Sequence, residues 1–287
     1  MVMAALERET PLSSSNKFRF LFFCAVKGDD TPNNYSFNWY SIDFREDRNS
    51  SSLASTVCPR PDCGTILSSV FSNMPRNVPR YFVSVALGTR IYLIGGRTGQ
   101  GRKASIHSDV FYFDVVHPEQ GWKEGPSMIM ARFKPSAVVL DSKIYVFGGV
   151  ESTGMLYAEV LNPVSDKWEP LPQPTFLLSN FVAPVHALLS DDKKERRLLF
   201  QPFDRDALFS YNLDTGSWEI FDECFGRNCY NETSVAVDGV LYCYFYPNVY
   251  AYDLLKQKWF SKPVRGLPRE DMHPPYHYTV FFISYRW

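Results

Sequence analysis

Short apolar segments alternate with polar turns over most of the chain. Two of them, Ile91–Ile94 and Ile144–Phe147, end in a double glycine, Gly95-Gly96 and Gly148-Gly149, and the two pairs are 53 residues apart. Each pair is followed by an aromatic strand, a polar turn and a tryptophan. A long unit that recurs at this spacing is typical of repeat folds built from small sheets. The pattern therefore predicts an all-β chain made of repeated units.

Four tryptophans mark the unit more regularly than the glycines do. Trp122, Trp168, Trp218 and Trp259 are separated by 46, 50 and 41 residues. In the last three units an Asn or Asp stands six residues before the Trp. Asx side chains stabilise turns by bonding to their own backbone. We therefore expect each unit to end in an Asx turn and an outer strand whose Trp ring covers the seam to a neighbouring unit.

The best-preserved unit predicts four strands, at residues 136–140, 143–147, 156–161 and 167–170. The two residues 141–142 between the first two strands fit a tight hairpin. At the end of the second strand, glycine permits a positive φ and a close approach of another backbone segment. The same role is expected for both double glycines.

A double glycine after an apolar strand, an aromatic Asx turn and then Trp resembles the kelch motif. The order of segments over residues 18–265 is similar to plant F-box/kelch-repeat proteins. The resemblance implies a kelch-type β-propeller of five to six four-stranded blades. The expected blades are a partial one over residues 18–75, then residues 80–127, 132–173, 180–222 and 231–264. In the last two of these, Gln201-Pro202 and Tyr244-Phe245 replace the glycines.

The two ends of the chain carry separate expectations. Residues 1–17 are predicted to be a flexible N-terminus with no innermost strand, and they hold no helical pattern long enough for an F-box. Residues 276–285 are predicted to form a closing strand beside the Phe18–Val26 strand, so that the first blade is completed by both termini. Such pairing would remove open sheet edges, which invite aggregation.

Composition narrows the classes of partner. The net charge of −1 gives no reason to expect nucleic acid or a membrane surface. No apolar run approaches the roughly 20 residues of a membrane helix. The chain is expected to be a monomer in the cytoplasm or nucleus, where its six Cys would be mostly free thiols.

The sequence offers little sign of a catalytic site, a metal site or a cofactor. His273 and His277 have the spacing of helical ligands, but Pro274 and Pro275 between them disfavour a helix. The chain is therefore expected not to be an enzyme. Two alternatives stay open: a small-molecule enzyme of the oxidase or epimerase kind that some kelch propellers form, and a truncated paralogue without a partner of its own.

Basic residues in the loops suggest a partner-binding surface. Arg pairs with carboxylates through two parallel hydrogen bonds, so a basic rim suits acidic groups on a protein partner. The candidate residues are Arg80, Arg97, Arg102, Lys103, Arg132 and Arg205. For Arg80 and Arg132, which occupy equivalent repeat positions, the alternative is that each braces its own blade. The resemblance implies a protein-interaction module, with recognition of ubiquitination substrates as its use.

Overall fold

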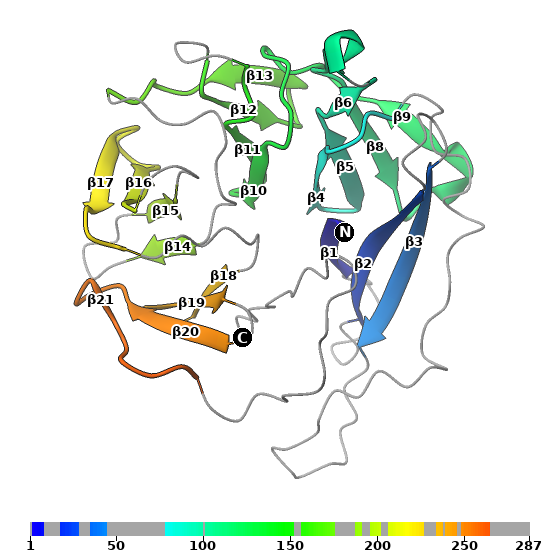
Figure 1. Cartoon of the computed structure of the whole chain (residues 1–287). Helices are drawn as coiled ribbons and strands as arrows, with labels where there is room; N and C mark the ends of the chain where they lie inside the picture. Colours follow the sequence, from blue (N-terminus) through cyan, green and yellow to red (C-terminus); the bar gives the residue numbers. More distant parts are fainter. Residues whose placement is uncertain are drawn as a thin grey trace, which may run out of the picture. The chain divides into compact units, whose positions relative to one another are not determined.

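The structure is a computed structural model, shown in Figure 1. It describes residues 2–8, 18–28, 35–44, 78–99, 101–151, 156–175, 187–190, 196–201, 206–226, 234–237, 239–245 and 248–264. Within these residues the regular structure is strand, with two short 3-10 turns at Gly101–Lys103 and Pro118–Gln120 and no α-helix. The prediction of an all-β chain is therefore confirmed.

In the part of the chain that the structure describes, the strands form one three-stranded sheet, four four-stranded sheets and one two-stranded hairpin. The first sheet is β1 (Val2–Arg8), β2 (Phe18–Gly28) and β3 (Tyr35–Phe44). The second is β4 (Val83–Leu87), β5 (Arg90–Ile94), β8 (Val110–Asp114) and β9 (Trp122–Glu124), with the hairpin β6 (Arg97–Thr98) and β7 (Ser105–Ile106) inserted.

Three further sheets follow in the same meander order, each strand pairing with the next along the chain. The third is β10 (Ser136–Leu140), β11 (Lys143–Phe147), β12 (Ala158–Asn162) and β13 (Lys167–Pro170). The fourth is β14 (Ala187–Ser190), β15 (Arg196–Phe200), β16 (Leu208–Asn212) and β17 (Trp218–Asp222). The fifth is β18 (Ser234–Val237), β19 (Val240–Phe245), β20 (Asn248–Asp253) and β21 (Lys258–Trp259).

The third sheet closely follows the prediction for its unit. Its first, second and fourth strands have the predicted bounds, and the third strand begins two residues later, at Ala158.

The chain divides into two compact units. The first comprises residues 1–133, 139–144 and 161–168, and the second comprises residues 134–138, 145–160 and 169–287.

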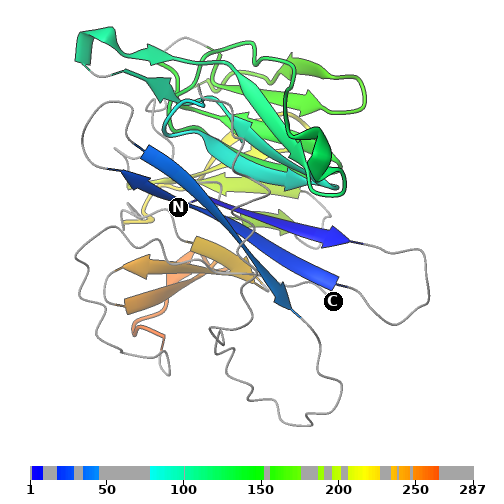
Figure 2. The same ribbon diagram turned by 90° about the vertical axis from the view of Figure 1, so that its right-hand side faces the viewer.

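The first sheet differs from the prediction. An innermost strand, β1, precedes Phe18 and pairs antiparallel with β2, with Ala4 opposite Phe22. The expectation of no strand there was wrong, because the short apolar run Val2–Leu6 is sufficient for an edge strand. Figure 2 shows β1, β2 and β3 as one antiparallel sheet. Both edges of β2 are thus occupied, by β1 and β3, and the expected closing strand at residues 276–285 lies outside the described residues.

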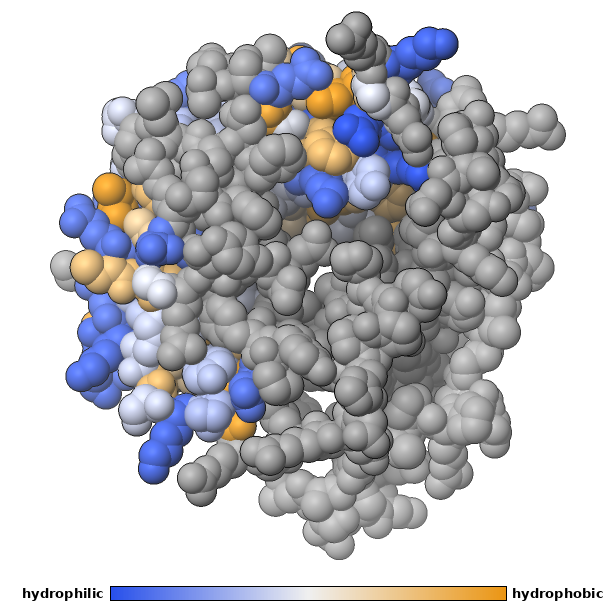
Figure 3. Space-filling view, in the orientation of Figure 1, coloured by the Kyte–Doolittle hydropathy of each residue, from blue (hydrophilic) through white to orange (hydrophobic). Residues whose placement is uncertain are grey.

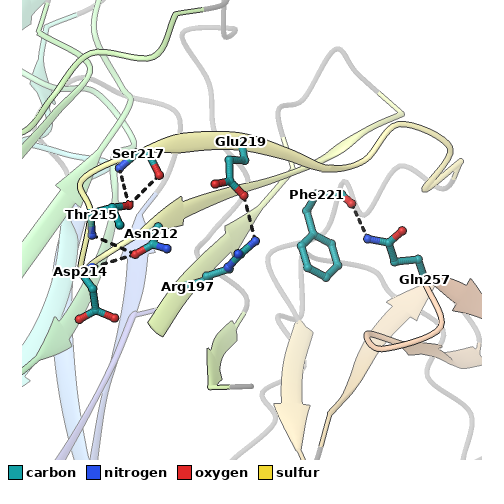
Figure 4. A network of polar contacts seen from close by, with 8 residues as sticks. All are labelled: Arg197, Asn212, Asp214, Thr215, Ser217, Glu219, Phe221 and Gln257. Atoms are coloured by element: carbon teal, nitrogen blue, oxygen red, sulfur yellow. Dashed lines mark hydrogen bonds and ion pairs between the residues drawn. The ribbon is translucent and has the colours of Figure 1, made fainter. Parts of the chain in front are cut away.

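The predicted Asx turns are present in all four four-stranded sheets. Each side-chain oxygen accepts a hydrogen bond from the backbone N–H two residues on, at 2.9–3.1 Å, and the four acceptors are Asp114, Asn162, Asn212 and Asp253. Figure 4 shows the Asn212 turn with its bonds to Asp214 and Thr215. These bonds satisfy backbone donors that the outer hairpin leaves unpaired.

Three tryptophans tie an outer strand to the sheet before it. The indole N–H of Trp168 donates to the carbonyl oxygen of Pro126 at 2.7 Å, that of Trp218 to Pro172 at 2.6 Å, and that of Trp259 to Phe225 at 2.6 Å. Each acceptor lies just after the last strand of the preceding sheet. The prediction that these rings cover a seam is confirmed, and the bonds show how the seam is held.

Aromatic packing fills the core beside these seams in the second unit. Trp218 packs against Phe200 and Tyr211, with ring centroids 5.3 and 4.8 Å apart. Trp259 packs in the same way against Phe225 and Tyr252, at 4.9 and 5.2 Å. Edge-on and tilted contacts of this kind add about 0.5–1.5 kcal/mol each to the burial of the rings.

No helix within the described residues is long and apolar enough to cross a membrane.

Candidate partner-binding surface

The double glycine Gly95-Gly96 joins three backbone segments. Gly95 N–H donates to the carbonyl of Asp109 at 2.9 Å, and Gly96 N–H to that of Arg132 at 2.8 Å. His107 N–H in turn donates to the Gly96 carbonyl at 3.0 Å. The turn after β5 therefore fixes the base of the β6–β7 hairpin and the segment that leads into the third sheet.

Only glycine fits at these two positions. Their φ values are +68° and +113°. A Cβ on Gly95 would lie 2.7 Å from the carbonyl oxygen of Arg132, and one on Gly96 would lie 2.6 Å from that of Arg80. The predicted positive φ and close backbone approach are confirmed here, and Gly148 and Gly149 also have positive φ, +65° and +71°. Gly148 N–H donates to Tyr157 O, as Gly95 does to Asp109.

The β6–β7 hairpin carries three of the expected basic residues. Arg97 begins β6, and residues 102 and 103 form the 3-10 turn at its tip, where Lys103 is exposed. Arg80 joins them through a backbone bridge, in which the N–H of each of Arg80 and Arg97 donates to the carbonyl of the other, at 2.8 and 2.6 Å. The structure therefore places Arg80 next to Arg97 and Gly96, at the base of the hairpin whose tip carries Lys103.

A hydrogen-bond chain stiffens the hairpin. The Oγ1 of Thr98 lies 2.6 Å from Nε2 of His107, whose Nδ1 lies 3.0 Å from Oδ2 of Asp109. With Asp109 accepting from Nδ1–H, the neutral ring accepts from the Thr98 hydroxyl at Nε2. These hydrogen bonds run from β6 to the segment between β7 and β8 and orient the hairpin against β8. No spacing pattern in the sequence predicts them, since the three residues meet only through the hairpin.

Arg97 lies against two aromatic rings. Its guanidinium carbon is 4.7 Å from the centroid of Phe133 and 5.9 Å from that of Tyr81, and the two rings meet edge-on at 5.1 Å. We call these three residues the aromatic–arginine cluster. Sequence reasoning picked Arg97 for its charge and missed the rings, although an aromatic residue directly follows Arg in both repeats, at Arg80-Tyr81 and Arg132-Phe133.

Three of the expected binding residues do not contribute a described surface side chain. Arg132 is 0% exposed, so it cannot contact a partner, and the alternative that it braces its own repeat fits its burial. A guanidinium is buried only where hydrogen bonds and neighbouring groups compensate its charge. Arg205 lies outside the described residues, as does the side chain of Arg102.

Polar and apolar side chains are mixed over this part of the first unit. Figure 3 shows blue hydrophilic residues beside orange hydrophobic ones over β4 to β6. Tyr81 is 47% exposed and Ile129, on the segment that leads to Phe133, is 49% exposed. Protein-binding surfaces commonly combine exposed aromatic, aliphatic and Arg side chains in this way.

The repeated four-stranded sheets, Asx turns and seam tryptophans define an array of kelch-like units. Residues 39–283 match the model of a family described as FKB95, Kelch-repeats domain. The match spans most of the chain, and the chain belongs to this kelch-repeat family. Its fold class is therefore that of the kelch-type β-propeller, and its four-stranded antiparallel sheets are the blades of that fold.

Curated proteins similar to this chain are named F-box/kelch-repeat proteins. The chain is 28% identical over 187 residues to F-box/kelch-repeat protein At4g19330 of Arabidopsis thaliana, covering 64% of this chain and 44% of that protein. It is 31% identical over 198 residues to F-box/kelch-repeat protein At4g33900 of the same plant, covering 64% and 50%. To F-box/kelch-repeat protein At4g39550 it is 27% identical over 262 residues, covering 87% and 61%. The chain spans about half the length of these relatives.

Proposed function

We propose that the chain is a non-enzymatic protein-interaction module that binds a protein partner through the surface around the β6–β7 hairpin. Support comes from the backbone bridge that places Arg80 next to Arg97 at the base of a hairpin whose tip carries Lys103. A rigid double-glycine turn supports the hairpin, so its basic residues are presented with little conformational freedom. Preorganised contact residues lower the entropy lost on binding.

The partner presents acidic groups to this surface. The hairpin sequence from Arg97 to Ile106 contains Arg97, Arg102 and Lys103 and no Asp or Glu. The neighbouring stretch from Val78 to Phe82 adds Arg80 and is likewise free of acidic residues. Because the whole chain is almost neutral, at −1, the local excess of positive charge concentrates here rather than following from composition.

Charge reversal on the hairpin tests the proposal. Exchanging Arg97, Arg102 and Lys103 for Glu should abolish capture of the partner from plant extracts by the purified chain, as followed by quantitative mass spectrometry. The control is Lys167→Glu, a single charge reversal at an exposed position on β13, compared with Lys103→Glu alone as well as with the triple variant. An unchanged set of captured proteins in the triple variant would refute the proposed surface.

The use of this binding is substrate recognition for ubiquitination. Support comes from the relatives, which are named F-box/kelch-repeat proteins. A captured partner that is a substrate should persist longer in cells that lack the chain, and its half-life should return to normal with the unaltered chain but not with the triple Glu variant. If the half-life of the partner is the same in all three kinds of cell, the chain does not recognise it for ubiquitination.

Two further properties belong to the same proposal. The chain acts as a monomer, in the cytoplasm or nucleus, without a cofactor, metal, nucleic acid or membrane. Light scattering of the purified chain should give one chain mass, and a fluorescent fusion should be found in one of those two compartments.

A further inference from the structure

The side chain of Arg97 is oriented by stacking rather than by an ion pair. Its guanidinium lies over Phe133 at 4.7 Å with Tyr81 on a second side, and within the described part of the chain no carboxylate pairs with it. Stacking uses the flat face of a guanidinium and leaves its N–H edge for hydrogen bonds in the plane. Within the described residues the side-chain N–H groups of Arg97 are therefore available to a partner, while its guanidinium lies against two rings.

A second stacked arginine in the same unit shows the contrast. The Arg90 guanidinium lies 4.7 Å above the ring of Tyr112. A hydrogen bond to Tyr92 raises the pKa of Arg90, with smaller contributions from Tyr112 and Asp114, so Arg90 already has a hydrogen-bond partner within the second sheet. Arg90 thus has a structural role. Arg97 has similar ring contacts, but within the described residues no carboxylate pairs with it.

The backbone at Tyr81 is strained. Its φ is +61°, a conformation that costs L-residues roughly 1–2 kcal/mol and that is a clear outlier for a bulky aromatic residue. The ring held there is 47% exposed, so burial of Tyr81 compensates little of this strain. Strained residues that persist at a surface point to a functional role.

We propose that the aromatic–arginine cluster recognises an acidic side chain that has an aromatic or aliphatic side chain next to it in the partner. This inference rests on the proposed function and specifies its partner. The N–H edge of Arg97 binds the carboxylate through charge-assisted hydrogen bonds. The exposed ring faces of Tyr81, whose centroid lies 5.9 Å from the Arg97 guanidinium carbon, cover the apolar neighbour. A purely acidic segment would leave these apolar surfaces in water and bind less tightly.

The probe for the test is a random-peptide phage library selected on the whole chain. Peptides enriched on the unaltered chain should carry Asp or Glu directly beside Phe, Tyr, Leu or Ile. Resynthesised with a fluorophore, they should lose about tenfold in affinity when the acid becomes its amide or the apolar residue becomes Ser. Enriched peptides without this pair, or no enrichment at all, would overturn the proposal.

Variants separate recognition from a structural role. Arg97→Lys keeps the charge but loses the stacked, forked geometry, and should weaken peptide binding about tenfold. Arg90→Lys is the matched control and should leave the affinity unchanged. Tyr81→Gly removes the ring and also relieves the positive φ, so it should weaken binding without lowering the thermal midpoint. If Tyr81→Gly lowers the midpoint and leaves peptide affinity unchanged, the ring is structural and the proposal fails.

The outcomes also distinguish this inference from the proposed function. If the triple Glu variant loses the captured partner while Arg97→Lys and Tyr81→Gly retain it, the hairpin surface binds by charge and the two-part recognition is wrong. If the triple Glu variant retains the partner, the proposed surface itself is wrong.

Discussion

The indole N–H of Trp218 donates a 2.6 Å hydrogen bond to the carbonyl oxygen of Pro172, 46 residues earlier in the chain. Pro172 follows the last strand of the third sheet, and Trp218 begins the last strand of the fourth. The same relationship links Trp259 to Phe225 and Trp168 to Pro126. The tryptophan of each of these repeats thus supplies a hydrogen-bond donor to a backbone carbonyl at the end of the preceding repeat.

The Trp218 bond and the Trp218 ring make separable contributions to stability. Trp218→Phe keeps an aromatic ring among Phe200 and Tyr211 but leaves the Pro172 carbonyl without its donor, and should lower the free energy of unfolding by about 1 kcal/mol. Trp218→Ala also empties the core and should cost about 3–5 kcal/mol. Urea unfolding followed by circular dichroism measures both. Phe260→Ala, at an exposed position, is the control, and equal midpoints for Trp218→Phe and the unaltered chain would contradict the prediction.

Gly96 should tolerate no side chain. Gly96→Ala combines a φ of +113° with a Cβ 2.6 Å from the Arg80 carbonyl, so the bridge between Arg80 and Arg97 must open. The expected loss is roughly 3 kcal/mol in the free energy of unfolding. Gly88→Ala is the matched control, because Gly88 has a φ of +61° with no neighbour within 4 Å of an added Cβ. It should cost only about 1 kcal/mol, and equal losses would show that steric contact at Gly96 is unimportant.

Glycine should have opposite effects at two equivalent turn positions. Asp166 and Gln257 both stand two residues before the seam Trp with φ near +50°, where the fourth sheet has Gly216. Asp166→Gly relieves this strain and should leave stability unchanged or raise it by up to ~0.5 kcal/mol. Gln257→Gly loses the 2.7 Å bond from Nε2 to the Phe221 carbonyl and should lower stability by about 1 kcal/mol (Figure 4). Thermal midpoints of the two variants test the sign, and a stabilised Gln257→Gly would be inconsistent with a role for that bond.

Acid should weaken the outer turns of the fourth and fifth sheets. The Arg196 side chain, with its backbone N–H, holds the pKa of Asp214 below its ordinary 3.8, and the backbone and side chain of Lys256 lower the pKa of Asp253. A carboxyl whose folded pKa is depressed contributes stability above its unfolded pKa and loses it as the pH falls through the folded value. Stability should therefore fall below about pH 4, and less steeply in Asp214→Asn. Parallel pH profiles for the two proteins would contradict the assignment to Asp214.

His107 should control the hairpin rather than the fold. His107→Ala removes the two side-chain hydrogen bonds that link Thr98 to Asp109 through the imidazole ring. It keeps the backbone hydrogen bonds of residue 107 to Gly96 and Arg132. Hydrogen exchange should become faster within residues 97–106 while the protection of β8 and β11 is unchanged. Faster exchange throughout both sheets would show instead that the ring supports the repeat as a whole.

The repeat was predictable from the sequence because its marks are local. An Asx residue six positions before a Trp defines a turn and an outer strand by bonds within a few residues, and the double glycines reveal a backbone that needs positive φ. The features that the sequence does not reveal depend on distant partners. Arg132 carries the same charge as a surface residue and is fully buried. Arg197 on β15 pairs with Glu219, which is 22 residues away (Figure 4). Arg196 pairs with Asp214, which is 18 residues away.

The candidate site was predictable in part for the same reason. The basic residues of the hairpin are visible as charges in a glycine-rich loop. The rings that orient Arg97 come from two segments about 50 residues apart, at Tyr81 and Phe133, and no spacing rule for a single segment brings them together. The strand β1 was missed because an edge strand needs few apolar residues, and a run as short as Val2–Leu6 is common in sequences that are not strands.

The seam acceptors are backbone carbonyls, and they belong to residues as different as Pro126, Pro172 and Phe225. The seam therefore imposes no requirement on the identity of the acceptor residue, only on where its carbonyl stands relative to the next tryptophan. Substitutions at the acceptor positions should preserve the seam bond, although the Phe225 ring is also held by its packing against Trp259 and Tyr252. Insertions and deletions there would shift the carbonyl out of reach of the indole N–H. The seam bond therefore depends on the number of residues in each acceptor segment.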